Sequence, residues 1–494
     1  MNLYEVVLAW IIALTLSNCD GEQLRVDPDL AAQQYYLQCK YVNKTDTYKE
    51  AFLETDLLYP SSYDLAKLRK ISRVCLPPPC EKLRAYSGYI PVDDIKLFYL
   101  FFLHIKSEDD MKKPLLLWLQ GGPGKSSLFG QFLENGPLGI AASGNLYYRK
   151  HTLLNYFNII YLDQPVGSGY SFDKEGKYPT SLKEASNHVI KFLLRFLQIF
   201  HEYAGRDLYI AGESYGARST VGVAHKLIKE KPQDLSLRFK GLMLGAGFLF
   251  PLLDIINSTD FLYYTTLLDE CSRNMFSNRF NKIYQLVEAG KYMNASMLLS
   301  MTVLNLRREG QKSLFEILTG FTHHGSIVVP QRPKETYAYY RYANSTKFKR
   351  IIHVSPTRVL DGTRYQISVQ LAVNDFFKDH REHFVDVLNR AHVLFYAAQL
   401  DAVFPAVNLA ESFKKLQWRG NKTFLETRRE LWHRKKNSSL ELLGYVKHVG
   451  AVMYADVLLA GHYVSLDRSS AVSELYANFL EFTKQPPPTD TPGR

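Results

Sequence analysis

The sequence contains only five cysteines in 494 residues, and no two pairs of cysteines or histidines have the spacing of a zinc finger. It therefore predicts no metal site, and nothing in it requires a cofactor. No internal repeat is evident, and no apolar run after the first 16 residues is long enough to span a membrane. With 46% hydrophobic residues, the chain can bury the core of one large domain.

The sequence also lacks any recognised nucleic-acid-binding module, although its net charge is +11. The densest basic stretch runs from Lys414 to Lys436. We expect this stretch to be a solvated amphipathic helix, with Phe413, Leu416 and Leu431 facing inward. The charge alone therefore predicts no nucleic-acid partner.

The amino terminus carries an apolar run from Val6 to Leu16, too short to cross a membrane comfortably. The run is preceded by Glu5 and lacks the Lys or Arg that usually comes before such a run. Its length is nevertheless typical of a signal peptide, which we predict over residues 1–19. Six Asn-x-Ser/Thr triplets fit a secretory route. The sequence thus predicts a secreted or lysosomal protein with candidate glycosylation sites at Asn43, Asn257, Asn294, Asn344, Asn421 and Asn437.

The compartments of the secretory route are oxidising, so the cysteines of this chain could form disulfides there. If Cys19 leaves with the signal peptide, Cys39, Cys75, Cys80 and Cys271 remain, and four cysteines allow three pairings. The stiff sequence LPPP separates Cys75 from Cys80, and we favour a bond between these two. None of the cysteines is a catalytic candidate.

A Gly-x-Ser-x-Gly pattern lies in the segment Leu208 to Gly216, between a strand-like run and the helix-compatible stretch Ala217 to Ile228. In a nucleophile elbow, Gly212 and Gly216 would let strand and helix approach closely while Ser214 is exposed at the helix N-terminus. A simple tight turn would give the same pattern. The strand before it and the helix after it favour the elbow.

A serine nucleophile needs a histidine base and an acid that orients the histidine. In an α/β-hydrolase the acid and then the histidine follow the serine, each in a loop after a sheet strand. Two buried-strand runs fit, His392 to Asp401 and Val452 to His462. Asp401 and His462 are therefore the candidates. Other histidines lie in a loop-like stretch or a predicted basic helix, which suit a base less well: His323, His324 and His433.

The oxyanion of an acyl-transfer reaction needs two backbone donors. One should be the N–H of Tyr215, directly after the nucleophile, and the other should come from a glycine-rich loop after an earlier strand. The strand-like run Pro114 to Leu119 precedes such a loop, in which Gly122 is the preferred donor. The loop also resembles the end of a phosphate-binding loop, but Leu119 stands where that motif needs a glycine, and Pro123 lacks an N–H.

From about Ser87 to about Phe479 the chain resembles the serine carboxypeptidases, most closely their vitellogenic carboxypeptidase-like branch. The resemblance rests on WLQGGPG, FLENGP, DQPVGSGYSF, GESYG, AAQLD and AGH, which occur in this order. It implies an α/β-hydrolase fold, the triad of Ser214, Asp401 and His462, and oxyanion donors at Gly122 and Tyr215. It also implies that the terminal carboxylate of a peptide is bound by three side chains, Gln120, Glu134 and Glu213.

Two glutamates that lie close together in space cannot both ionise without a large cost in free energy. One of them therefore retains a proton and can donate a hydrogen bond to a substrate carboxylate. We therefore expect peptide C-termini to bind best at mildly acidic pH. Glu213 could instead be a solvated carboxylate at the start of a helix.

The domain organisation predicted from these segments is one large core with an insertion. An N-terminal extension over residues 20–86 should precede a core made of residues 87–251 and 350–480. Residues 252–349 are predicted to form a helical lid, which would shape the pocket over the carboxyl ends of the strands. The polar, proline-rich tail at 485–494 is predicted to be disordered.

The predicted function is that of a serine-type carboxypeptidase that releases C-terminal amino acids through an acyl-enzyme and whose partners are peptide or protein C-termini. An esterase or acyltransferase with the same triad is an alternative. So is an inactive or weakened paralogue, because Lys125 and Ala217 depart from the family pattern near the site.

Overall fold

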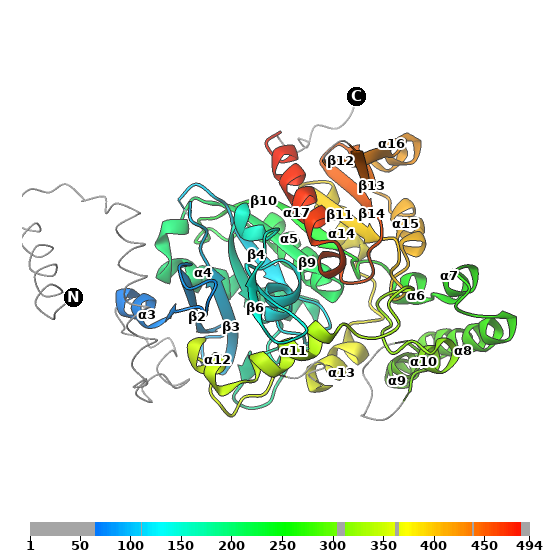
Figure 1. The fold of residues 1–494 in the computed structure, drawn as a ribbon, viewed down its shortest axis with the longest axis horizontal. Helices are drawn as coiled ribbons and strands as arrows, with labels where there is room; N and C mark the ends of the chain where they lie inside the picture. The colour runs from blue at the N-terminus through cyan, green and yellow to red at the C-terminus, as the bar shows by residue number, and fades with distance from the viewer. Residues whose placement is uncertain (1–64, 110, 304–311, 361–364, 437–438, 486–494) are drawn as a thin grey trace, which may run out of the picture. The chain divides into compact units, whose positions relative to one another are not determined.

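A sheet of twelve strands forms the centre of the computed structural model, which describes residues 65–109, 111–303, 312–360, 365–436 and 439–485, all within the unit Thr47–Arg494 (Figure 1). The main path of the sheet is β1-β2-β3-β7-β4-β9-β10-β11-β14-β13-β12, with β8 paired to β3. The six strands from β7 to β14 along this path are parallel to one another, and antiparallel strands flank them. The α/β architecture with a mostly parallel sheet is therefore confirmed.

The strands in the described ranges, including the separate pair β5 and β6, are β1 Arg73–Val74, β2 Ala85–Pro91, β3 Phe98–Ile105, β4 Leu115–Leu119, β5 Leu138–Ile140, β6 Leu146–Tyr148, β7 Asn158–Leu162, β8 Phe172–Asp173, β9 Asp207–Glu213, β10 Arg238–Gly245, β11 His392–Ala398, β12 Glu430–Lys436, β13 Ser439–Val449 and β14 Val452–Val457. The helices there are α3 Leu65–Ile71, α4 Leu182–Ile199, α5 Tyr215–Glu230, α6 Leu252–Ile256, α7 Thr259–Tyr264, α8 Glu270–Glu288, α9 Tyr292–Thr302, α10 Leu314–Thr319, α11 Lys334–Ala343, α12 Thr346–Ile351, α13 Tyr365–Asn374, α14 Arg381–Leu388, α15 Ala406–Lys414, α16 Asn421–Glu426 and α17 Val464–Phe482.

The central strands are continuous apolar runs because both faces of the sheet are covered. Strand β9 illustrates this arrangement, since successive side chains of a strand point to opposite faces. Leu208 and Ile210 pack in a core with α4, whereas Tyr209 and Ala211 pack in a different core with α17. Helix α5 also packs on the α4 side, against β9 and β10. The serine-bearing end of β9 is therefore held between two helical layers.

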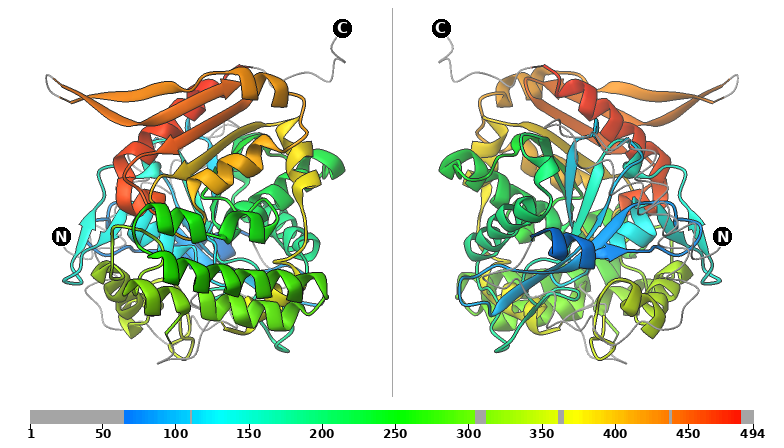
Figure 2. Two further views of the ribbon diagram at one scale, coloured as in Figure 1. Left: turned by 90° about the vertical axis from the view of Figure 1, so that its right-hand side faces the viewer. Right: turned by 90° about the vertical axis from the view of Figure 1, so that its left-hand side faces the viewer.

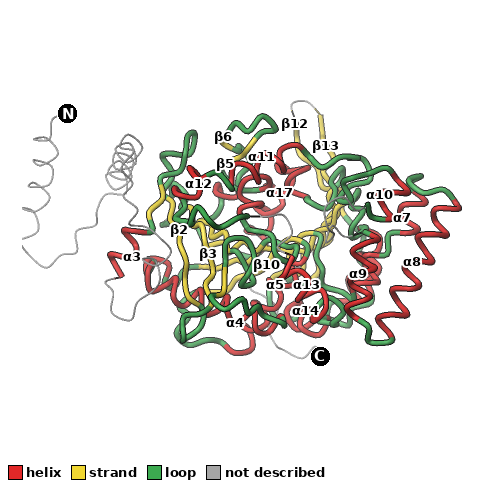
Figure 3. Tube along the Cα trace, turned by 90° about the horizontal axis from the view of Figure 1, so that it is seen from below, coloured by secondary structure: helices red, strands yellow, loops and turns green. Residues whose placement is uncertain are grey.

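All described elements between β10 and β11 are helical, from α6 to α14. In this region α8 and α9 lie side by side (Figure 3). Helix α14 packs against α5, so part of the segment covers the sheet rather than extending away from it.

The basic stretch from Lys414 to Lys436 is not the single amphipathic helix that we predicted. Helix α15 ends at Lys414, α16 is short, and β12 then pairs with β13 in an antiparallel hairpin that projects from the sheet (Figure 2). Phe413 and Leu416 are buried as expected, but Leu431 is 61% exposed. The prediction failed because the pairing of β12 with β13 decides the conformation of this stretch. A helical spacing of apolar residues carries no information about that pairing.

The predicted bond between Cys75 and Cys80 is also wrong. Cys75 is disulfide-bonded, but Cys80 and Cys271 are both free. The side chain of Cys80 is instead buried in the core that contains Val74 and Leu76, and this burial raises the pKa of its thiol to about 12. Proximity along a stiff chain was therefore a poor guide to pairing.

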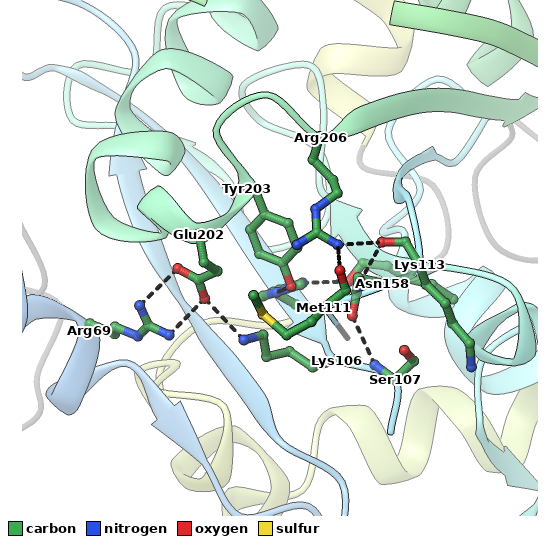
Figure 4. Close-up of polar contacts among 11 residues, drawn as sticks. Arg69, Lys106, Ser107, Met111, Lys113, Asn158, Glu202, Tyr203 and Arg206 are labelled. Carbon is green, nitrogen blue, oxygen red and sulfur yellow. Dashed lines mark hydrogen bonds and ion pairs between the residues drawn. The ribbon is translucent and has the colours of Figure 1, made fainter. Parts of the chain in front are cut away.

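Helix α3 is fixed to the rest of the fold by a half-buried ion-pair cluster (Figure 4). The carboxylate of Glu202 accepts hydrogen bonds from both terminal nitrogens of Arg69, at 2.8 and 2.7 Å, and from Lys106 Nζ at 3.0 Å. Next to it His104 Nδ1 donates to Ile159 O, and His104 Nε2 accepts from Tyr203 Oη, both at 2.9 Å. Burial lowers the pKa of His104 to about 3, so this histidine is neutral.

The predicted signal peptide, Asn43, Asn437 and residues 486–494 of the predicted disordered tail lie outside the described residues. None of the helices in the described ranges combines the length and the apolar character that a membrane crossing requires.

Candidate active site

Ser214 lies between the end of β9 and the start of α5, with φ 58° and ψ −125°. A positive φ is strained for a serine, and such strain is typical of a nucleophile elbow. Two backbone hydrogen bonds stabilise the turn: Ser214 N donates to Gly245 O at 2.9 Å, and Phe248 N donates to Ser214 O at 3.1 Å.

The two glycines of the motif are needed for close approach. A Cβ atom on Gly212 would lie 2.3 Å from Gly216 O, and one on Gly216 would lie 2.0 Å from Leu119 O. Both obstacles are backbone atoms, which cannot move aside as a side chain could. The pattern that sequence analysis interpreted as an elbow therefore has the backbone of one.

Asp401 and His462 follow β11 and β14 and meet at the carboxyl edge of the sheet. His462 Nδ1 lies 2.9 Å from Asp401 Oδ2, and both side chains are almost fully buried. Asp401 Oδ1 accepts hydrogen bonds from the backbone N–H groups of Val403 and Phe404, at 2.8 and 3.0 Å. The carboxylate is thus aimed at the imidazole by its own loop.

The histidine loop is tied to the elbow and to the helical segment. Val464 N donates to Glu213 Oε1 at 3.1 Å, which links the residue before Ser214 to the residue two after His462. His462 N donates to Gly325 O at 2.7 Å. The Ser214–His462 hydrogen bond that a triad requires stays a prediction.

The two candidate oxyanion donors come from elements that touch. As the first residue of α5, Tyr215 has an N–H without a partner inside the helix. A Cβ atom on Gly121 would lie 2.9 Å from Ser214 Cβ and 3.0 Å from Tyr215 N, so the loop that carries Gly122 passes directly over the elbow. Gly122 itself has φ 121°, which only glycine adopts readily.

Sequence analysis missed the residue that holds this loop. The buried carboxylate of Asp163 accepts hydrogen bonds from Ser126 Oγ and Ser127 N, both at 2.7 Å, and from Tyr170 N at 2.8 Å. The conspicuous block DQPVGSGYSF contains Asp163, but only the fold shows which segment the block contacts.

Gln120, Glu134 and Glu213 are brought together in a buried group beside the elbow. Gln120 Nε2 donates to Glu134 Oε1 at 3.3 Å and to Glu213 Oε2 at 3.5 Å, while Gln120 Oε1 accepts from Trp118 Nε1 at 2.8 Å. The Trp118 contact fixes which end of the Gln120 amide faces the carboxyls.

Burial dominates the titration of the two carboxyls. It raises the pKa of Glu213 well above its ordinary value, and the negative charge of Glu134 raises it further. Burial also raises the pKa of Glu134, although a hydrogen bond with Glu213 and the charge of Lys125 oppose that rise. The pair therefore retains a proton at a pH where exposed glutamates have lost theirs.

Lys125 points toward the histidine loop. Its amino group donates a hydrogen bond to Tyr463 Oη and lies over the rings of Tyr463 and Phe129, at 4.4 and 4.9 Å from their centroids. Tyr463 directly follows His462, so the departure from the family pattern at position 125 links the glycine-rich loop to the histidine loop.

The rival histidines have different surroundings. His323 and His324 lie near His462, but burial lowers the pKa of His323 to about 4 and that of His324 well below its ordinary value. His433 lies in strand β12, not in the helix that we predicted. Among the described residues, no group of three or more His, Cys, Asp and Glu side chains is arranged to hold a metal ion.

Four of the candidate glycosylation sites are described. Asn294 is exposed on α9, and Asn257 and Asn421 are half-buried. Asn344 Nδ2, the atom that would carry a glycan, donates to Tyr340 O and Leu360 O. Glycosylation stays a prediction.

Comparisons with known proteins agree with this geometry. A model of the serine carboxypeptidase family matches residues 77–482. The chain is 29% identical over 409 residues to the probable serine carboxypeptidase CPVL of Mus musculus, covering 82% of this chain and 84% of the relative. It is 30% identical to the venom serine carboxypeptidase of Apis mellifera (81% and 85% covered) and 27% identical to the vitellogenic carboxypeptidase of Aedes aegypti (81% and 84% covered).

The fold also matches a solved structure, that of Kex1(delta)p, a prohormone-processing carboxypeptidase from Saccharomyces cerevisiae. The TM-score is 0.69 at 18% identity, with 84% of this chain and 96% of the other covered. The expected α/β-hydrolase fold is therefore confirmed. The match over residues 77–482 shows that the chain belongs to the serine carboxypeptidase family of peptidases.

Proposed function

We propose that the protein releases single amino acids from the C-termini of peptides through an acyl-enzyme on Ser214. The observation that carries the proposal is the 2.9 Å contact between His462 Nδ1 and Asp401 Oδ2, in a loop tied to the residue before Ser214. With Nδ1 held by the carboxylate, Nε2 of His462 is free to accept the proton of the serine hydroxyl.

In the proposed reaction, Ser214 Oγ attacks the carbonyl carbon of the last peptide bond, and His462 takes the hydroxyl proton. The N–H groups of Gly122 and Tyr215 hold the oxyanion of the tetrahedral intermediate. His462 then protonates the leaving amino group, and the free amino acid departs. Water, deprotonated by His462, attacks the ester on Ser214. His462 returns that proton to Ser214 Oγ as the ester bond breaks and the shortened peptide leaves.

The buried group of Gln120, Glu134 and Glu213 would bind the terminal carboxylate of the substrate. The Gln120 amide and the proton shared by the two glutamates are hydrogen-bond donors, which a carboxylate accepts. Because the pKa values of both glutamates are raised, the shared proton persists into mildly acidic conditions. As pH rises and the proton is lost, the pair repels the substrate anion, so KM should rise.

The helices between β10 and β11 are proposed to include a lid over the pocket. Support comes from Gly325, which follows α10 and whose carbonyl accepts a hydrogen bond from His462 N. We also propose a secretory route, on the basis of the apolar run Val6 to Leu16, the exposed triplet at Asn294 and relatives named venom and vitellogenic carboxypeptidases.

Hydrolysis of a peptide with a free C-terminus, compared with the same peptide amidated, tests the proposal. We expect wild-type protein to remove the last residue of the free peptide at pH 5 and to act far more slowly on the amide, with no activity in Ser214→Ala. Equal rates on both peptides would contradict the assigned carboxylate site. Cleavage of simple esters without release of any amino acid would favour an esterase instead.

A further inference from the structure

Helix α13 contacts one side of the predicted oxyanion hole through Ser368. The hydroxyl of Ser368 donates a hydrogen bond of 2.6 Å to Pro123 O, and both residues are buried. Pro123 directly follows Gly122, the candidate donor of the glycine-rich loop. This contact therefore fixes the Pro123–Gly124 peptide unit, two units along the chain from the one that carries the Gly122 N–H.

The end of the same helix contacts the other side of the hole. Asp375 follows α13 and is fully buried; its Oδ2 accepts a hydrogen bond from Tyr215 Oη at 2.9 Å. The same oxygen forms an ion pair of 2.9 Å with Arg218 Nε, one turn further along α5. Tyr215 carries the second candidate donor on its backbone.

Further contacts hold the Asp375 end in place. Arg218 Nη2 donates to Asp375 O at 2.8 Å and to Lys378 O at 2.6 Å, and His380 Nε2 lies 3.0 Å from Asp375 Oδ1. Burial alone would raise the pKa of Asp375, but His380, Arg218 and Tyr215 together hold that pKa below its ordinary value. Asp375 is therefore a carboxylate that accepts from Tyr215.

Ser368 and Asp375 are seven residues apart, which is two helical turns or about 10 Å along the axis. Asp375 directly follows α13 and continues its spacing, because its N–H donates to Leu371 O at 2.8 Å. Seven residues return to nearly the same side of a helix, so one side of α13 and the residue after it contact the glycine-rich loop and the start of α5. Neither segment alone determines the distance between Gly122 and Tyr215. A rigid helix that contacts both segments does determine that distance.

We propose that α13 and Asp375 position the two oxyanion donors relative to each other, with Asp375 and Ser368 as positioning residues. The inference rests on the proposed function, because it concerns the donors of that same site. Oxyanion donors act only if they are already aimed at the charge that develops in the transition state. A displacement of about 1 Å can cost about a hundredfold in rate.

Helix α13 with Asp375, which we call the brace, also connects the predicted oxyanion hole to the neighbouring helices. Ser296 Oγ, on α9, donates to Ala372 O of α13 at 2.8 Å, and the rings of Tyr292 and Phe377 are stacked with centroids 5.8 Å apart. Helices α9 and α13 pack against each other, with α9 beside α8 at the edge of the fold in Figure 3. Ser87 of β2, whose buried hydroxyl donates to Ile352 O at 2.8 Å, takes no part in these contacts and supplies a matched control.

The experiment compares Asp375→Asn, Ser368→Ala and the control Ser87→Ala in the full-length protein, with kcat and KM measured for release of the C-terminal residue of a peptide. For Asp375→Asn and Ser368→Ala we expect kcat to fall about tenfold to a hundredfold while KM changes by less than about twofold. Ser87→Ala removes the same kind of hydroxyl-to-carbonyl bond away from α13, and its kcat should equal that of the wild type.

A double-mutant cycle tests whether Asp375 acts through Tyr215. Tyr215→Phe removes the phenol hydroxyl but keeps the backbone N–H. If the proposal holds, the double variant Tyr215→Phe/Asp375→Asn loses little more kcat than Asp375→Asn alone. Losses that multiply would overturn it.

The outcomes separate this inference from the proposed function. If the wild type is active and both Asp375→Asn and Ser368→Ala have the same kcat as the wild type, the positioning role of the brace is overturned. The peptidase proposal would still stand. A wild type that releases no amino acid would overturn the proposed function itself. If Asp375→Asn does not fold, Ser368→Ala and Tyr215→Phe carry the test, and unchanged kcat in both overturns the brace.

Discussion

The carboxylate of Asp401 accepts two backbone hydrogen bonds through Oδ1, and its Oδ2 lies 2.9 Å from His462 Nδ1. The backbone donors hold the carboxylate still, and the imidazole is thereby held in the tautomer that leaves Nε2 unprotonated. Phe404 contributes a second constraint, since its ring packs edge-on against that of His462 with centroids 5.3 Å apart. At this scale the site is defined by the direction in which each side chain is aimed.

Asp401→Asn should lower kcat for peptide hydrolysis by about a thousandfold to ten-thousandfold, because an amide can hold the imidazole in the wrong tautomer. The steady-state rate at saturating substrate measures this effect. The control is Asp386→Asn, which removes an ion pair of 3.1 Å with Arg390 away from the site and should leave kcat unchanged. A kcat for Asp401→Asn within tenfold of wild type would contradict the assigned role.

Lys125→Met tests the charge beside the carboxyl pair. Lys125 lowers the pKa of both Glu134 and Glu213, so its removal should raise those pKa values. The pair would then keep its proton to higher pH, and the pH at which KM begins to rise should move upward. Lys125→Arg keeps the charge and should leave the profile in place. A downward move in Lys125→Met would be inconsistent with this account.

At the scale of elements, the junction of β4, β9 and α5 depends on backbone contacts that leave no room for a side chain. Gly216→Ala would place a methyl group 2.0 Å from Leu119 O, which should destabilise the protein by about 2–3 kcal/mol. The matched change is Gly290→Ala, which has positive φ but no atom within 4 Å and should cost about 1 kcal/mol. Denaturant unfolding measures both, and equal losses would refute the close approach.

The sequence predicted those elements whose signal is local. The apolar runs Pro114 to Leu119 and His392 to Asp401 match β4 and β11 closely, and Ala217 to Ile228 lies within α5. The basic stretch to Lys436 was predicted wrongly, because charge and helical spacing do not reveal that β12 pairs with β13. Elements that depend on partners distant in sequence were outside the reach of local patterns.

The same distinction applies to the site. Motifs identified the residues that the proposed chemistry needs, because their types and positions after strands follow from that chemistry. Asp163, Ser368 and Asp375 belong to no chemical motif, since each holds a backbone or side chain that lies far away in the sequence. The partner of Lys125 was equally unpredictable, because Tyr463 approaches it only in the folded chain.

At the scale of the whole molecule, the proposed carboxylate site makes stability depend on pH. The folded-state pKa of Glu213 lies well above its ordinary value of 4.5, so the folded protein binds that proton more tightly than the unfolded chain does. The resulting stabilisation is complete below pH 4.5 and is lost as pH rises through the folded pKa. Every tenfold gain in the affinity of the folded protein for this proton stabilises the fold by about 1.4 kcal/mol.

Glu213→Gln removes this titration. The difference in Tm between wild type and Glu213→Gln, measured by calorimetry from pH 4.5 to pH 9, should therefore move steadily against the wild type as pH rises. Comparing the two proteins cancels the contributions of the neutral buried histidines, such as His104, which both share. A difference that stays constant, or that moves in favour of the wild type, would show that Glu213 ionises normally.

The central claim is that Ser214, His462 and Asp401 act together, although they are remote in sequence. Labelling with a fluorophosphonate, followed by mass spectrometry of the labelled peptide, tests it most directly. We predict a phosphonyl adduct on Ser214 in the wild type, slowed by orders of magnitude in His462→Ala and Asp401→Asn. An unlabelled Ser214 in folded wild-type protein, or labelling that is equally fast in all three, would contradict the account.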